Sequence, residues 1–273
     1  MKNQSSCGSC WAFASTELIE SHVAIETGTL LELSVQQLVD CVPNAQHCGG
    51  GGGCTGAIVE VALDYVISNG GMVAEDTLEY TAEDGTCPLH EKHFFRGSFN
   101  NEFNNDENKI IMRAMQQEIK KVAGILDYVV LPTNDYKTVM NAIAKTGPVA
   151  ISVDAEKWYM YESGIFSNNG VEGENWDINH AVVLVGYGTD EKTGLEYWLV
   201  RNSWGPKWGE SGYIRLLRNE DKVCGIDTTP FDGTGCQFDV NGNKLIPEPV
   251  EVCGTNGILF DVVVPTGGHL LNV

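Results

Sequence analysis

The fold of this chain is indicated first by one short stretch, Gln4-Ser5-Ser6-Cys7-Gly8-Ser9-Cys10-Trp11-Ala12-Phe13. Two later segments complete it, Asn179-His180-Ala181-Val182 and Asn202-Ser203-Trp204-Gly205. A cysteine, a histidine and an asparagine in this chain order are the parts of a cysteine nucleophile, its base and the group that orients the base. The candidate catalytic residues are therefore Cys10, His180 and Asn202.

The length and composition of the chain are those of a soluble globular protein. Its 273 residues are enough for one large or two medium domains, and its hydrophobic and charged fractions, 42% and 20%, are ordinary. The net charge of −20 argues against nucleic acid or an anionic membrane surface as the main partner. No apolar run approaches the roughly 18 residues of a membrane-spanning helix. The acidity fits either simple solubility or work in an acidic compartment, and composition leaves both open.

Nine cysteines are many for a cytosolic enzyme of this size. With Cys10 set aside as a nucleophile, eight remain, which is consistent with up to four disulfides and an oxidising compartment. No apolar signal-peptide core follows Met1, although such a compartment would require one. We therefore expect the chain to be a processed or truncated product.

The first part of the chain is predicted to be helical and the later part to form strands. Near-helical spacing of apolar residues predicts three helices, at 10–27, 33–40 and 58–67. Five consecutive glycines at 49–53 predict a loop. Runs of β-branched and aromatic residues predict strands, at 149–153, 181–187, 197–200 and 212–216. This order indicates an α+β fold in two lobes.

The three motifs together resemble the papain family of cysteine proteases, and in particular its cathepsin L-like members. The resemblance covers about residues 3–89 and 119–231. It implies a papain-like α+β fold with a helical left lobe over residues 1–119 and a β-barrel-like right lobe over 120–231. The active-site cleft is then expected between the two lobes.

The chain departs from the family pattern in two places. Residues from about 90 to 118 form an atypical insertion with a predicted amphipathic helix at 109–115, and residues 232–273 form a C-terminal extension beyond the usual end of the family. The insertion accounts for most of the unusually long separation between the cysteine and histidine motifs. Neither departure touches the catalytic motifs.

The resemblance gives each residue of the site a role. Cys10 is expected to be the nucleophile, ionised as a pair with protonated His180, and Asn202 to hold the imidazole through its side-chain oxygen. Gln4 is expected to join the Cys10 backbone N–H in an oxyanion hole. Trp204 is expected to shield the hydrogen bond between Asn202 and His180 from water.

Substrate-binding positions are carried over in the same way. The positions that hold the backbone of a peptide correspond to Gly8, Thr55, Gly56 and Ala57. Ile178 and Asn179 are expected to line the pocket for the second residue before the scissile bond and, with Ala57, to favour an apolar side chain there. The chain lacks the His-His loop that gives cathepsin B its dipeptide-removing activity, so we expect an endopeptidase that acts on protein or peptide substrates.

Two disulfides follow from the resemblance, Cys7–Cys54 and Cys41–Cys87. Cys236 and Cys253 are expected to close a loop within the extension, which leaves Cys48 and Cys224 to pair or to stay free. Neither His47 with Cys48 and Cys54 nor His90 with His93 has the regular spacing of a metal site, so we expect no metal and no cofactor.

Two alternatives to an active endopeptidase remain open. The first is a binding module on the same fold that has lost catalysis. The second is a truncated, non-functional fragment, because the family has a segment ahead of Gln4 that crosses between the lobes. The resemblance also implies an inhibitory propeptide that is not part of this chain, a monomer, and a lysosomal, vacuolar or secreted location.

Overall fold

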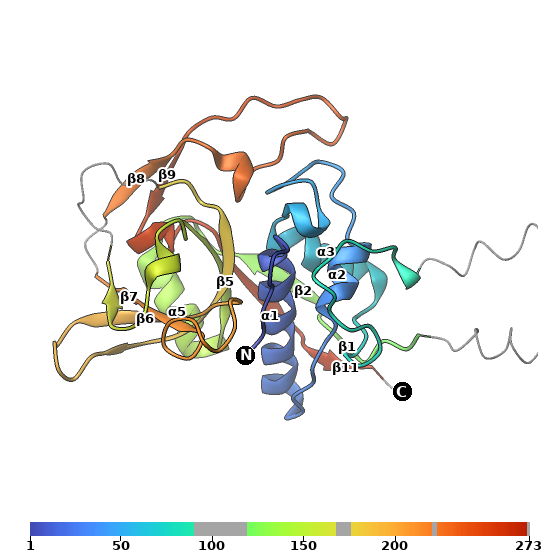
Figure 1. The fold of residues 1–273 in the computed structure, drawn as a ribbon, viewed down its shortest axis with the longest axis horizontal. Helices are drawn as coiled ribbons and strands as arrows, with labels where there is room; N and C mark the ends of the chain where they lie inside the picture. Colours follow the sequence, from blue (N-terminus) through green and yellow to red (C-terminus); the bar gives the residue numbers. More distant parts are fainter. Residues whose placement is uncertain (90–118, 168–175, 220–222, 272–273) are drawn as a thin grey trace, which may run out of the picture.

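The protein folds into a helical lobe and a sheet lobe, which lie side by side in Figure 1. This computed structural model describes residues 1–89, 119–167, 176–219 and 223–271. The expected insertion at 90–118, with its predicted helix, lies outside these residues. Within the described parts of the chain, no helix is long and apolar enough to cross a membrane.

The helical lobe contains the predicted helices. Helix α1 ends at Gly28, whose φ of 75° is a left-handed conformation that glycine adopts without strain. Helix α2 begins after Ser34, because the Ser34 side chain accepts a hydrogen bond from the backbone N–H of Gln37. The helical elements of this lobe are α1 (Cys10–Thr27), α2 (Val35–Cys41), η1 (Gly53–Thr55) and α3 (Val59–Asn69). All three predicted helices are therefore confirmed.

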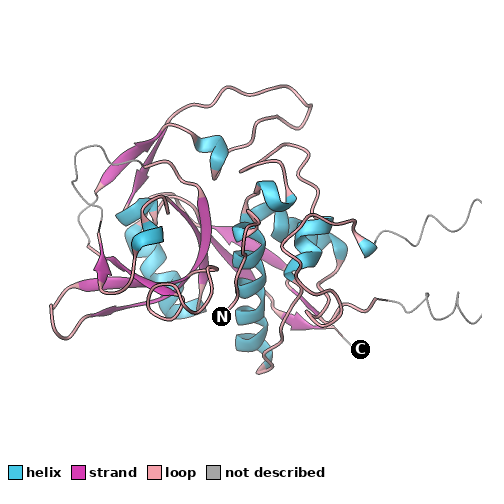
Figure 2. Cartoon of the chain, viewed as in Figure 1, coloured by secondary structure: helices cyan, strands magenta, loops and turns pink. Residues whose placement is uncertain are grey.

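The sheet lobe is built on a seven-stranded sheet with the order β2-β10-β3-β5-β6-β7-β4. Figure 2 shows these strands gathered beside the helical lobe. Neighbouring strands are antiparallel, except that β4 runs parallel to β7. The strands are β2 (Asp127–Val130), β3 (Val149–Val153), β4 (Ile165–Phe166), β5 (His180–Thr189), β6 (Glu196–Arg201), β7 (Tyr213–Leu217) and β10 (Val262–Thr266). The predicted strands correspond to β3, β5, β6 and β7.

The central strands β3 and β5 are buried on both faces of the sheet, which explains their continuous apolar runs. Ala181 and Val183 of β5 pack into the core that contains α1. Val182 and Leu184 of the same strand pack into the second core, together with α5 (Tyr136–Thr146). Since successive residues of a strand point to opposite faces, β5 joins the two lobes through one sheet.

The last residues of the chain are part of this shared core. Strand β10 lies between β2 and β3, and its Val263 faces the helical lobe. Strand β11 (His269–Leu270) then pairs with β1 (Ala123–Gly124) beside the helices. The C-terminal strands β10 and β11 thus cross between the two lobes. The resemblance leads one to expect such a crossing from a segment ahead of Gln4. The proposed boundaries of the lobes and of the extension stay a prediction.

The disulfide expected between Cys236 and Cys253 is wrong. Strand β8 (Cys224–Asp227) pairs with β9 (Val250–Cys253) and places Cys224 directly opposite Cys253. Cys236 lies instead beside Cys48. The disulfides of the structure are Cys7–Cys54, Cys41–Cys87, Cys48–Cys236 and Cys224–Cys253. The first two have the pairing that the resemblance implies.

Candidate active site

Cys10 is the first residue of α1, at the edge of the helical lobe that faces the sheet lobe. The turn before it packs tightly against the loop around Cys54: the Gly8 N–H donates to the Cys54 carbonyl at 3.0 Å, and a Cβ at Gly8 would lie 2.6 Å from that oxygen. Glycine is therefore required at this position. The thiol of Cys10 is the only free cysteine among the described residues, and it lies at the positive end of the α1 dipole.

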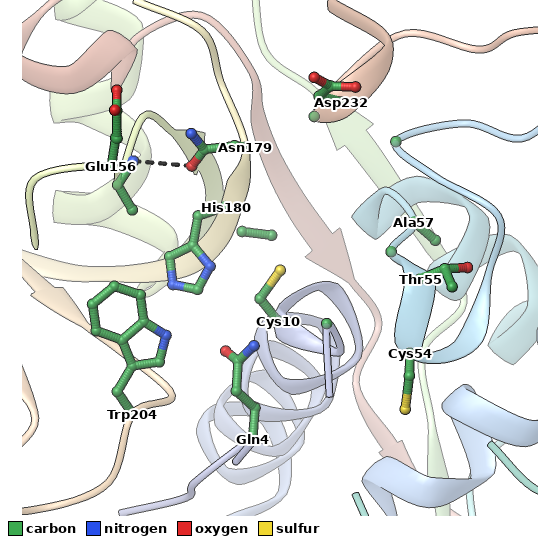
Figure 3. Close-up of a pocket in the computed structure, with 16 residues that line it drawn as sticks. Gln4, Cys10, Cys54, Thr55, Ala57, Glu156, Asn179, His180, Trp204 and Asp232 are labelled. Carbon is green, nitrogen blue, oxygen red and sulfur yellow. Dashed lines mark hydrogen bonds between the residues drawn. The ribbon is translucent and has the colours of Figure 1, made fainter. Parts of the chain in front are cut away.

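The sheet lobe supplies the partner of this thiol. His180 begins β5, opposite Val153 of β3, and Asn202 follows the end of β6. The His180 Nε2 donates to the Asn202 Oδ1 at 2.8 Å, which leaves Nδ1 to the Cys10 thiol. Asn202 is fully buried, so this hydrogen bond is protected from water and holds the ring in one orientation. Figure 3 shows the imidazole beside the sulfur.

The two groups favour ionisation of each other. Burial opposes a thiolate at Cys10, but the charge of His180 and hydrogen bonds from His180 and the backbone outweigh it, so the pKa of the thiol is lowered. Burial likewise opposes an imidazolium, yet the Cys10 thiolate and the hydrogen bond to Asn202 raise the pKa of His180. The geometry therefore supports a thiolate–imidazolium pair.

Gln4 is fixed beside the sulfur by its own hydrogen bonds. Its Nε2 donates to the Cys7 carbonyl at 3.0 Å, and its Oε1 accepts from the Ser203 hydroxyl at 2.6 Å. An amide NH₂ group has two hydrogens, so one remains for a ligand. Figure 3 shows the amide directed toward Cys10.

Three tryptophans pack together on the sheet-lobe side of the imidazole, and two of them contact its ring. The centroid of the Trp204 ring lies 5.2 Å from that of the His180 ring, and the Trp158 centroid lies 6.1 Å from it, with the Trp158 and His180 planes nearly perpendicular. Trp208 contacts both tryptophans and donates from Nε1 to the Trp158 carbonyl at 3.0 Å. These apolar rings limit the access of water to the hydrogen bond of the histidine.

Comparison with known proteins identifies the family. The model of the family described as "Papain family cysteine protease" matches residues 1–234. This chain belongs to the papain family of cysteine proteases. In sequence it is 40% identical to the oryzain beta chain of Oryza sativa subsp. japonica over 231 residues, and 35% identical to cathepsin K of Mus musculus over 228 residues. Each alignment covers 83% of this chain, but only 42% and 58% of the length of these relatives.

Solved structures of the papain family have the same fold. The bromelain protease from Ananas comosus, in complex with the E64 inhibitor, superposes with a TM-score of 0.68 at 30% identity and covers 98% of this chain and 93% of its own. Digestive procathepsin L 3 of Tenebrio molitor gives a TM-score of 0.65 at 28% identity, over 97% of this chain and 65% of its own. The expected two-lobe α+β architecture is therefore confirmed.

The cleft of this papain-family chain holds a cavity of about 440 Å³ around Cys10 and His180. The predicted site residues that line it beside the catalytic groups are Gly8, Thr55, Gly56, Ala57, Asn179 and Trp204. Ile178 does not line it. Its side chain is fully buried beneath Gly233 and Gly257, so the expected contact of Ile178 with a substrate is wrong.

Other residues of the cleft are not apparent from the sequence. The additional lining residues are Gly49, Cys54, Ala155, Glu156, Ala181, Asp232 and Gly233. Asp232 and Gly233 lie in the region that the sequence assigns to the extension. The one signal for their place was Cys48, whose partner the sequence left open; in the structure Cys48 binds Cys236 and joins this region to the helical lobe.

Proposed function

We propose that this chain is an endopeptidase that hydrolyses peptide bonds through a Cys10 thioester. Family membership and the hydrogen-bonded series from Cys10 through His180 to Asn202 support the proposal. The series is the single observation that carries it, because a merely structural cysteine would need neither a buried imidazole nor a buried amide to orient it.

In the first half of the reaction, the Cys10 thiolate attacks the carbonyl carbon of the scissile bond. The negative charge moves to the carbonyl oxygen, where the Gln4 side-chain amide and the Cys10 backbone N–H stabilise it; such a donor contributes about 3 kcal/mol in the transition state. His180 gives its proton to the departing amine as the C–N bond breaks. The acyl group remains on sulfur as a thioester.

In the second half, water replaces the amine. Neutral His180 removes a proton from water, and the resulting hydroxide attacks the thioester carbonyl. The C–S bond breaks, the carboxylic acid leaves, and the thiolate–imidazolium pair is restored. Asn202 acts throughout as the positioning residue that keeps the ring turned toward both sulfur and substrate.

The chemistry is tested by covalent labelling. The protein is reduced mildly and incubated at about pH 5.5 with an epoxide inhibitor of papain-type enzymes. Its intact mass is then measured by mass spectrometry. A single adduct that maps to Cys10 and disappears in His180→Ala is expected. A folded protein that takes no adduct would favour the inactive binding module, and hydrolysis that survives Cys10→Ala would refute the nucleophile.

The disulfides support a proposal for where the enzyme works. Four disulfides fit an oxidising location, and we place the protein in a lysosome, a vacuole or the extracellular space. Protein or peptide substrates are its expected partners, with an inhibitory propeptide encoded outside this chain. We expect it to act as a monomer, which sedimentation of the inhibited protein would test.

A further inference from the structure

A segment of the sheet lobe reaches across the cleft to the helical lobe. This segment, the bridge (residues 230–238), follows β8 and is seen in orange at the top of Figure 1. The Cys48–Cys236 disulfide ties it to the helical lobe, and the Gly49 N–H donates to the Gly235 carbonyl at 2.9 Å. A covalent bond and backbone hydrogen bonds therefore fix the bridge in place over one end of the cavity.

The bridge places a carboxylate in the cleft. Asp232 lines the cavity that surrounds the catalytic pair, across from Ala57 of the helical lobe. Its side chain is exposed, and no described residue donates a hydrogen bond to it or forms an ion pair with it. The described residues that line the cavity include no lysine or arginine. The carboxylate is therefore available to a substrate.

The chemistry of the proposed function says which part of a substrate meets this carboxylate. His180 must protonate the departing amine, so the part of the substrate after the scissile bond lies toward His180 and Trp204. The part before the scissile bond then extends in the other direction. In Figure 3 the Asp232 carboxylate and the Trp204 ring lie on opposite sides of Cys10.

We propose that Asp232 is a specificity residue that binds a positively charged group in the part of a peptide substrate before the scissile bond. This inference rests on the proposed function and names the substrate class of the same site. An ammonium or guanidinium group would form a charge-assisted hydrogen bond with the carboxylate inside a partly enclosed cavity, where solvent screens the pair less than on an open surface. Because Ile178 is buried, one of the apolar side chains expected in this part of the cleft does not contact the substrate.

Two groups of a peptide have this chemistry, a lysine or arginine side chain and the free α-amino group. Fluorogenic peptides distinguish them. In the first arm the amino end is blocked, and the second residue before the scissile bond is arginine or the uncharged norleucine. In the second arm that residue is norleucine, and the amino end is free or blocked. Active enzyme is counted with the epoxide inhibitor, so that kcat/KM refers to folded, competent molecules.

The variants are Asp232→Asn, which keeps the size of the side chain, and Glu248→Gln, which removes one charge from an exposed residue that does not line the cavity. We expect Asp232→Asn to lower kcat/KM for the charged peptide of one arm about tenfold and to leave its uncharged partner within about twofold. Glu248→Gln should leave kcat/KM unchanged for both the charged and the uncharged peptides. It removes only one exposed charge from a protein whose net charge is −20, so the attraction of cations to the whole surface hardly changes.

The arm in which Asp232→Asn lowers kcat/KM for the charged peptide identifies the group that Asp232 binds. Equal loss for charged and uncharged peptides, or equal loss in both variants, would overturn the inference while the proposed function stands. If no peptide is cleaved and no adduct forms at Cys10, the proposed function fails, and this inference fails with it.

Discussion

Replacing Glu60 with glutamine should make the stability of this protein less dependent on pH. Glu60 of α3 faces Asp261, which precedes β10 in the segment that crosses between the lobes. Asp261 is buried and accepts a hydrogen bond from the Ser152 hydroxyl at 2.6 Å. The buried Oε2 of Glu60 accepts no hydrogen bond from the described residues. Two carboxyl groups thus meet away from water, between the helical lobe and the sheet lobe.

Burial first, and then the neighbouring charge of Asp261, raise the pKa of Glu60 to about 8. A carboxyl whose pKa is higher in the folded than in the unfolded protein stabilises the fold fully below its ordinary pKa, and that contribution is lost as the pH rises through the folded value. Each pH unit between the two values is equivalent to about 1.4 kcal/mol. Between pH 5 and pH 7.5, the titration of Glu60 should therefore lower the free energy of unfolding by about 3 kcal/mol.

The measurement is urea unfolding of the wild-type protein and of Glu60→Gln, both at pH 5 and at pH 7.5. Both proteins are first labelled with the epoxide inhibitor, which prevents self-digestion and removes the titration of Cys10. Glutamine imitates the protonated acid and can still donate to Asp261, so the variant should lose about 3 kcal/mol less than the wild type over this pH interval. Titrating groups that do not interact with Glu60, such as Glu17 with its raised pKa of about 7, act equally in both proteins and cancel.

Glu248→Gln is the control for the removal of one negative charge, and its pH dependence should equal that of the wild type. If Glu60→Gln and the wild type lose the same stability between pH 5 and pH 7.5, the two carboxyl groups do not share a proton, and the reasoning is refuted. The expected result would mean that acidic pH stabilises the contact between α3 and the segment that contains Asp261.

Three further predictions concern the site and the packing. Asn202→Ala should lower kcat/KM about 10- to 100-fold because the imidazole loses its orienting oxygen; unchanged hydrolysis by titrated enzyme would contradict this. Val263→Ala should cost about 1–3 kcal/mol in urea unfolding because its side chain is 1% exposed, whereas Val240→Ala, at 85% exposed, should cost almost nothing; equal costs would refute the shared core. Replacing Cys48 and Cys236 together with serine should cost about 2–4 kcal/mol, and an unchanged unfolding midpoint would argue against the bridge.

The sequence by itself determined the features that local chemistry specifies. Helical periodicity located the helices, and β-branched runs located the central strands, because these signals act between residues a few positions apart. The catalytic motifs could also be recognised from the sequence, since each of Cys10, His180 and Asn202 lies in a distinctive segment. Their meeting across the lobes was inferred from the family and not from any local pattern.

The tertiary structure alone decided what depends on distant partners. The position of β10 between β2 and β3 and the pairing of Cys48 with Cys236 join residues more than a hundred positions apart, and no local preference distinguishes them from other pairings. The same holds for the burial of Ile178 and for the place of Asp232 in the cleft. Which surfaces meet is determined by the packing of the whole core, because burial of apolar area is non-directional and favours any arrangement that excludes water.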